Sequence, residues 1–162
     1  MDQTTSLRPE QPADEPFLSQ LYATTRDYEM NRVPWDDRQK EAFLRMQFEL
    51  QTHHYRQYYP DAAFLIVQSA ERPIGRLCVH RSSERILVID IALVPENRGS
   101  GIGARLMKEL MSEAAAAEIP VQIHVERHNP ALRLYERLGF RVVEDKGVHL
   151  FMEWRPCASA GK

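Results

Sequence analysis

The chain has 162 residues, of which 43% are hydrophobic and 27% are charged, and its formal net charge at pH 7 is -2. The length fits one domain with a single core, and the composition is that of a globular protein rather than a disordered one. The charge balance argues against nucleic acid as a partner, because a footprint on DNA or RNA needs an excess of Lys and Arg.

The cysteines and the apolar runs bear on the cellular location. Cys78 lies inside an apolar run and Cys157 lies in the tail, so the two form no disulfide framework and favour a reducing compartment. No apolar segment approaches the roughly 18 residues of a membrane span, and the N-terminus lacks the pattern of a signal peptide. We therefore expect a cytoplasmic protein with no membrane partner.

The N-terminal segment predicts a strand followed by a helix. The strand covers Thr4–Arg8 and ends at Pro9. Asp14 is a suitable N-cap for the helix, and Pro16 is tolerated in the first turn. The expected buried stripe of this helix consists of Phe17, Leu18, Leu21 and Tyr22.

A longer helix is predicted from an N-cap at Asp36 to about Gln57, with two apolar stripes. One stripe contains Phe43, Met46 and Leu50, and the other contains Leu44, Phe48, Tyr55 and Tyr59. A helix that is apolar on two sides packs between a sheet and a neighbouring helix, or takes part in a dimer contact. The alternative is that its far end lines a binding pocket, with His53, His54, Tyr55, Arg56, Tyr58 and Tyr59 as the lining.

Three strands follow as a meander, over Ala63–Gln68, Ile74–His80 and Arg85–Val94, with a turn at Ala70–Pro73. Their centres are almost continuously apolar, which is typical of a sheet that helices cover on both faces.

The most informative segment is Val88–Leu110, which passes from an apolar strand through glycines at 99, 101 and 103 into a helix. Glycine lets backbone N–H groups approach a ligand closely, and the start of a helix favours phosphate. Arg98 adds a guanidinium suited to phosphate oxygens. No Lys-Ser or Lys-Thr pair follows, as a Walker A loop requires, and Leu106 stands where a dinucleotide fingerprint needs its third glycine. The segment therefore predicts a pyrophosphate-binding turn.

The rest of the chain predicts a crossover and a hairpin. The helix after the glycines runs to about Glu118, before Pro120, and a parallel strand follows at Val121–Glu126. The remaining expected elements are a helix opened by Asn129-Pro130 and ended at Leu138 and Gly139, strands at Arg141–Asp145 and Val148–Trp154, and a loose tail over 156–162. We expect a single domain over residues 1–155.

Two segments resemble motifs of the GCN5-related N-acetyltransferase (GNAT) superfamily. Residues 98–103, RGSGIG, are similar to its R/Q-x-x-G-x-G/A signature. Residues 129–140 are similar to N-x-x-A-x-x-L-Y-x-x-x-G-F, with the alanine displaced by one place. The resemblance implies an α/β (α+β) acyl-CoA N-acyltransferase fold, with a mixed six- or seven-stranded sheet and helices on both faces. It further implies that the fourth and fifth strands splay apart around acetyl-CoA.

The resemblance also assigns binding roles by matching position. Main-chain groups of Ile91, Ala92, Leu93 and Val94 would meet the pantetheine arm. The pyrophosphate would be held by backbone N–H groups of Arg98, Gly99, Ser100, Gly101, Ile102, Gly103 and Ala104. Asn129 would hydrogen-bond the cofactor, and Tyr135 would sit near its sulfur.

Acetyl transfer to an amine requires a proton for the leaving thiolate and a base for the amine. Tyr135 suits the first role, since tyrosine has a reference pKa of about 10 and a thiol one near 8.5; the alternative is that Tyr135 only packs in the apolar stripe of its helix. Asp90 and Glu126 are the candidate bases, and the alternative is that they pair with an arginine such as Arg76 or Arg127. Transfer without a dedicated base is a further option, if a small fraction of the amine is already neutral.

His124, Glu126 and His128 alternate, so their side chains share one face while the predicted strand lasts, but we expect no metal there, because the Cys half of a zinc deaminase motif is absent. A polar wall of the acceptor channel is the simpler hypothesis.

We expect an acetyl-CoA-dependent N-acetyltransferase that acts on a primary amine of a small molecule or peptide. The alternatives are a silent acyl-CoA-binding sensor and an enzyme for longer acyl groups. A homodimer, common in the family, stays open, and the far end of the long helix favours an acceptor with a carboxylate or an aromatic group.

Overall fold

The computed structural model describes residues 5–157. The chain divides into two compact units, each considered by itself below. One unit contains the chain up to Cys78 together with Asp90–Gly99, and the other contains Val79–Ile89 together with the chain from Ser100 onward. The single domain over residues 1–155 stays a prediction, and residues 1–4 and 158–162, including Thr4 and most of the expected tail, lie outside the described residues.

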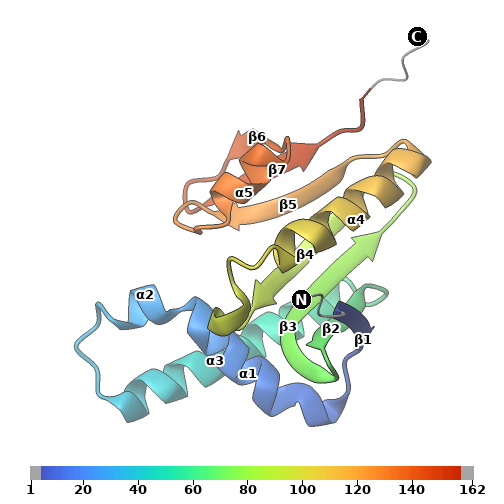
Figure 1. Ribbon diagram of the computed structural model, residues 1–162. Coiled ribbons are helices and arrows are strands. Elements are labelled where there is room, and N and C mark those ends of the chain that lie inside the picture. The colour runs from blue at the N-terminus through green and yellow to red at the C-terminus, as the bar shows by residue number, and fades with distance from the viewer. Residues whose placement is uncertain (1–4, 158–162) are drawn as a thin grey trace. The chain divides into compact units, whose positions relative to one another are not determined.

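The elements follow the predicted order (Figure 1). The strands are β1 (Thr5–Pro9), β2 (Ala63–Ser69), β3 (Arg72–Arg81), β4 (Ile86–Leu93), β5 (Val121–Glu126), β6 (Arg141–Asp145) and β7 (His149–Trp154). The helices are α1 (Glu15–Thr25), α2 (Asp27–Met30), α3 (Asp37–Tyr58), α4 (Ile102–Ala117) and α5 (Leu132–Arg137), with short 3-10 turns at η1 (Pro12–Asp14) and η2 (Pro95–Asn97).

The strands form one mixed sheet of seven, in the order β1-β2-β3-β4-β5-β7-β6. β4 and β5 pair in parallel through the α4 crossover, whereas β1–β2, β5–β7 and β6–β7 are antiparallel. The parallel register joins Ile86–Val88 to Val121–Ile123, and both strands continue beyond these residues. The predicted mixed sheet with one parallel pair is confirmed.

In the first unit, α1 and α3 pack against each other (Figure 1). Leu18, Phe48 and Ile66 form a buried cluster, with Phe17 and Tyr22 packed against it. Capping of α3 by Asp36 is confirmed, because its side chain accepts a hydrogen bond from the Gln39 N–H. The predicted stripe of Phe43, Met46 and Leu50 is not buried by the described residues, since Met46 is 47% and Leu50 59% exposed.

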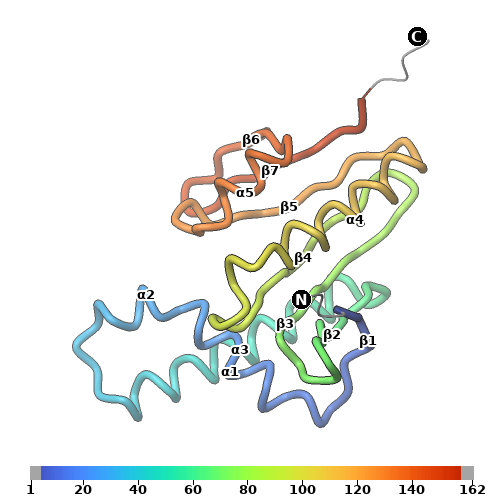
Figure 2. The backbone as a smooth tube through the Cα atoms, in the orientation of Figure 1, coloured from blue at the N-terminus to red at the C-terminus, as the bar shows by residue number. Residues whose placement is uncertain are grey.

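In the second unit, β6 and β7 form the predicted hairpin near the C-terminus (Figure 2). The α4 residues Leu106, Met107, Leu110 and Ala114 are buried. On β5 the buried residues Val121, Ile123 and Val125 alternate with Gln122, His124 and Glu126, which are more exposed.

Two local expectations need correction. Asp14 stands at the N-cap of α1 but makes no capping hydrogen bond; its carboxylate accepts from Arg8 at 2.7 and 2.8 Å and from the Gln11 N–H at 2.8 Å. The helix expected from Pro130 starts only at Leu132, because the Asn129 Oδ1 accepts from the Ala131 N–H at 2.8 Å and closes a local turn. β5 ends at Glu126, as predicted, so His128 does not share a strand face with His124.

Residues 5–157 contain no helix long and apolar enough to cross a membrane. The same part of the chain contains no group of three or more His, Cys, Asp or Glu residues arranged to hold a metal ion.

Candidate active site

The glycine turn leads directly into α4. Gly99 and Gly101 have φ values of +73° and +90°, in the left-handed region that favours glycine. The hydrogen bond from the Arg105 N–H to the Gly101 carbonyl, at 3.0 Å, is the first of the helix. The N–H groups of Ile102, Gly103 and Ala104 therefore precede the helical ladder, at the end where the helix dipole favours an anion.

Gly103 differs from Gly99 and Gly101 because neither its backbone conformation nor its packing requires glycine. Its φ is not in the left-handed region, and among the described residues a Cβ placed on it would meet only the Leu134 Cδ2, at 4.0 Å. Alanine is the better helix former. Neither backbone conformation nor packing therefore accounts for a glycine at this point, whereas a ligand that approaches the backbone closely would favour one.

Arg98 is anchored by its own unit. Its Nε donates to the Leu93 carbonyl at 2.9 Å, and its Nη2 donates to the Thr24 Oγ1 at 2.8 Å. Nearby, the Val94 N–H donates to the Ile74 carbonyl at 2.8 Å. Of the main-chain groups assigned to the pantetheine arm, the Leu93 carbonyl and the Val94 N–H thus already have partners within the chain.

Gly75 of β3 is a residue that sequence reasoning missed. A Cβ there would lie 2.4 Å from the Ala92 carbonyl oxygen and 2.7 Å from the Leu93 Cδ2. Such distances are closer than real Cβ contacts allow, so only glycine lets β3 approach this part of β4. The available signal was a lone glycine inside a predicted strand, which often marks a close backbone approach.

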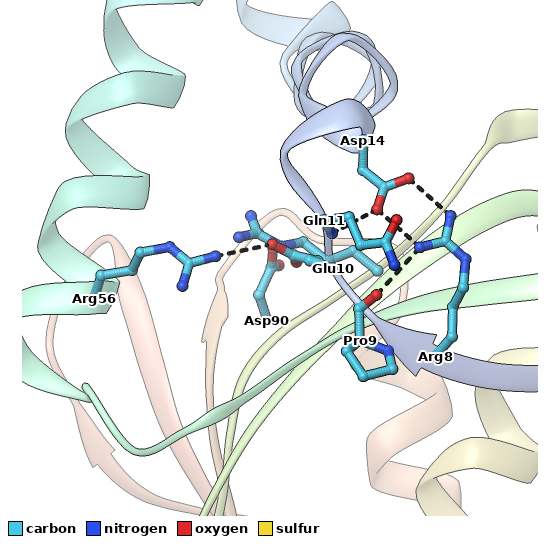
Figure 3. A network of polar contacts seen from close by, with 8 residues as sticks. Arg8, Pro9, Glu10, Gln11, Asp14, Arg56 and Asp90 are labelled. Carbon is cyan, nitrogen blue, oxygen red and sulfur yellow. Dashed lines mark hydrogen bonds and ion pairs between the residues drawn. The ribbon is translucent and has the colours of Figure 1, made fainter.

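Asp90 of β4 is part of a chain of ion pairs (Figure 3). Its Oδ2 lies 3.7 Å from the Arg76 Nη1, and 27% of its side chain is exposed. The Arg76 Nε donates to the Glu10 Oε2 at 2.8 Å, and both of these side chains are about 95% buried, at 4% and 5% exposure. The Arg56 Nη2 donates to the other oxygen of Glu10 at 3.3 Å. The pairing of Asp90 with Arg76, considered from the sequence, is therefore present.

The surroundings of Asp90 change its acidity. Burial raises the pKa of its carboxyl group, and the positive charge of Arg76 opposes that rise in pKa. Burial also raises the pKa of the Tyr55 hydroxyl and of the Cys78 thiol, so both neighbours stay protonated at neutral pH. A carboxylate with a raised pKa, in contact with solvent, has the properties that a general base needs.

The second unit holds the other candidates. Tyr135 of α5 is 4% exposed, and its ring centroid lies 5.9 Å from that of Phe140, so the packing role is present and the proton-donor role stays a prediction. Glu126 is 33% exposed, with its Oε2 3.8 Å from the His149 Nε2 on the neighbouring strand. Arg127, considered as its partner, donates to the Gly147 carbonyl at 3.0 Å and pairs with Asp145.

A match to a protein-family model shows the family to which the chain belongs. The model of the acetyltransferase (GNAT) domain matches residues 60–142, a little over half of the 162 residues. The chain belongs to the GNAT acetyltransferase family.

Solved structures agree with this fold assignment for the GNAT chain. It is similar to the PaiA N-acetyltransferase from Thermoplasma acidophilum in complex with coenzyme A, with a TM-score of 0.69 and 19% identity over 94% of this chain and 99% of that chain. It is also similar to an acetyltransferase from Thermus thermophilus, with a TM-score of 0.65 and 21% identity over 95% and 97% of the two chains. These identities show the fold alone. No curated protein sequence matches the chain.

The matched segment of this GNAT chain contains the glycine turn, Asp90 and Tyr135. Glu10 lies before that segment, and nothing local in the sequence pointed to it. A signal existed in its partner, because Arg76 stands inside an apolar strand, and a buried guanidinium needs a carboxylate.

Proposed function

We propose that the chain transfers an acetyl group from acetyl-CoA to a primary amine of a small molecule or peptide. The observation that carries the proposal is Gly103, a glycine that the fold does not need, placed among the backbone N–H groups at the start of α4. The family supports acetyl transfer, and the coenzyme A in the Thermoplasma acidophilum structure supports the cofactor. These residues fit a diphosphate, which needs close backbone and unpaired N–H donors.

Acetyl-CoA would supply the thioester carbonyl that the amine attacks and the thiolate that leaves. The N–H groups of Ile102, Gly103 and Ala104 would hold the diphosphate, with Ser100, Gly101 and the backbone of Arg98 and Gly99 completing the turn. Ile91 and Ala92 would contribute main-chain groups to the pantetheine arm, and Asn129 would donate to the cofactor from its amide.

Tyr135 would act as the proton donor. A buried tyrosine hydroxyl keeps its proton at neutral pH and can give it to a sulfur that gains negative charge. The burial of Tyr135 supports this role, because a fixed ring holds its hydroxyl in one place.

Asp90 would accept the proton that the amine loses, directly or through a water. The raised pKa and the partly exposed side chain of Asp90 support this residue as the base. Glu126 is less favoured, because it pairs with His149 on the more exposed face of β5.

We further propose a cytoplasmic location and a homodimer in which the exposed Met46 and Leu50 of α3 are covered. Light scattering after gel filtration tests the assembly, and a monomer at micromolar concentration would remove it.

The function is tested by thiol release from acetyl-CoA over a panel of amino acids, polyamines, aminoglycosides and peptide N-termini. We expect release with at least one amine class, with formation of the N-acetyl product confirmed by mass. Binding of acetyl-CoA, measured by calorimetry, without thiol release for any amine would support a silent sensor.

A further inference from the structure

A cavity of about 490 Å³ lies in the first unit, beside the ion pairs of Glu10. Its walls come from the link between β1 and α1, from α1, from α3 and from β3. Leu18 and Phe48, 6% and 4% exposed, give it an apolar side, and Glu10, Arg56 and Arg76 give it a charged end.

The carboxylate of Glu10 is fully engaged at this charged end. One oxygen accepts from the Arg76 Nε at 2.8 Å and the other from the Arg56 Nη2 at 3.3 Å (Figure 3). A carboxylate held by two guanidinium groups has little capacity left for a cation. The charged end is therefore not a site for an ammonium group or a metal ion.

Arg56 has the opposite character. Its side chain is 54% exposed, and among the described residues its guanidinium donates to Glu10 alone, through one long hydrogen bond. Its Cζ lies 4.4 Å from the centroid of the Phe64 ring, a contact that uses no N–H group. Four of the five N–H donors of the guanidinium thus stay available, and a planar guanidinium can bind a carboxylate with two parallel hydrogen bonds.

Thr52 lies one turn before Arg56 on α3 and also lines the cavity. Its Oγ1 is buried and has no hydrogen-bond partner in the described part of the chain. Buried polar atoms of native proteins almost always have a partner, so this hydroxyl is a donor that a bound group can use. A ligand carboxylate beside Arg56 would provide an acceptor after a rotation of the threonine about χ1.

The charge of the lining distinguishes a carboxylate from a phosphate. Glu10 and Glu15 balance Arg56 and Arg76, so the four groups have no net charge. Because these charges cancel, the lining does not compensate for the larger cost of removing a phosphate dianion, rather than a monoanion, from water. The apolar side of Leu18 and Phe48 further favours a ligand with a hydrocarbon body.

We propose that this cavity binds a small molecule with one carboxylate and an apolar body, with Arg56 as the residue that recognises the carboxylate. Amino acids are such molecules and carry an amine as well, so the ligand is either the acceptor itself or a separate carboxylate. The first case rests on the proposed function; the site as such does not.

Calorimetric binding to the full chain tests the site with three matched probes and inorganic phosphate. Leucine carries both groups, 4-methylpentanoate lacks the amine, and 3-methylbutylamine lacks the carboxylate. We expect the two carboxylates to bind more tightly than the amine and than phosphate. Arg56→Gln should weaken both carboxylates about 10- to 100-fold, the effect of losing a charge-assisted hydrogen bond. Arg45→Gln, at an exposed position of the same helix, should change neither.

Equal binding of 4-methylpentanoate to wild type and Arg56→Gln, or tighter binding of phosphate than of the carboxylates, would overturn the proposal. Competition of 4-methylpentanoate with the amine in thiol release would support the site and identify the ligand as the acceptor. Binding without competition would support the site and identify a separate carboxylate. Failure of thiol release with every amine would refute the proposed function, while the calorimetry would still decide on the cavity.

Discussion

Replacing Gly103 with alanine separates what the fold needs from what a ligand needs. The new Cβ would meet only the Leu134 Cδ2, at 4.0 Å, which is an ordinary contact. Because alanine restricts the unfolded chain and favours the helix, the free energy of unfolding should rise by about 0.4 to 1 kcal/mol. For a chain of this size that corresponds to an increase in Tm of about 1 to 4 °C without ligand.

The same methyl group should weaken coenzyme A binding. It stands among the three N–H groups that precede the helical ladder, so it would hold a diphosphate away from them. Losing one hydrogen bond to a charged group costs about 1.5 to 3 kcal/mol, or roughly 10- to 150-fold in Kd. A variant that is more stable alone but binds the cofactor more weakly is the expected combination.

Thermal unfolding with and without coenzyme A measures both effects, because a ligand that binds only the folded state raises Tm by an amount that grows with the ratio of ligand concentration to Kd. Ser112→Ala, on the exposed part of α4, controls for helix propensity and should leave the cofactor affinity unchanged. Gly101→Ala should lower Tm, because its φ of +90° disfavours any side chain. An unchanged Kd for coenzyme A in Gly103→Ala would refute the assignment of the turn, and a lower Tm would refute the account of the fold.

Three further outcomes are expected. Tyr135→Phe should lower kcat by roughly 10- to 1,000-fold in thiol release, and wild-type turnover would remove the proton-donor role. Arg76→Gln should move the acidic limb of the kcat/KM profile to higher pH, because the cation that lowers the pKa of Asp90 is lost, and Arg76→Lys should restore the limb; a profile that does not move would contradict this. Asp14→Asn should lower the free energy of unfolding by about 1 to 3 kcal/mol near neutral pH, measured by urea denaturation. Arg8 lowers the pKa of Asp14, so the stabilisation by the Asp14 carboxylate is complete above the ordinary pKa of 3.8 and is lost as the pH falls below it. The difference in unfolding free energy between wild type and Asp14→Asn should therefore shrink in acid, and a difference that stays the same would contradict this account.

Elements whose bounds depend on local residues are predicted well from the sequence. β5 has the predicted bounds, and α4 starts within one residue of its prediction, because a strand pattern, a glycine and a proline act locally. The start of α5 is missed because two local devices compete: Asn129 is as suitable for a tight turn as for a helix cap.

Contacts between distant segments are the part that the sequence does not reveal. Glu10 and Arg76 are 66 positions apart, and no periodicity relates them, yet their ion pair defines the surroundings of Asp90. The outer stripe of α3 shows the same limit, because an apolar pattern indicates a buried face without saying which neighbour covers it.

Asp90 offers the clearest contrast between stability and function. Its folded-state pKa is raised by burial, so its contribution to stability is lost as the pH rises through that pKa, and the ionised group weakens the fold at neutral pH. Arg76 keeps its hydrogen bond to Glu10 without Asp90, since the two acids contact different nitrogens. Asp90→Asn should therefore unfold at the same or a higher urea concentration than wild type at pH 7, with the difference narrowing in acid, while thiol release falls. A fold that keeps an acid where an amide is more stable does so for chemistry. If the asparagine variant proves less stable at pH 7, the ion pair with Arg76 accounts for Asp90 and the base must be sought elsewhere.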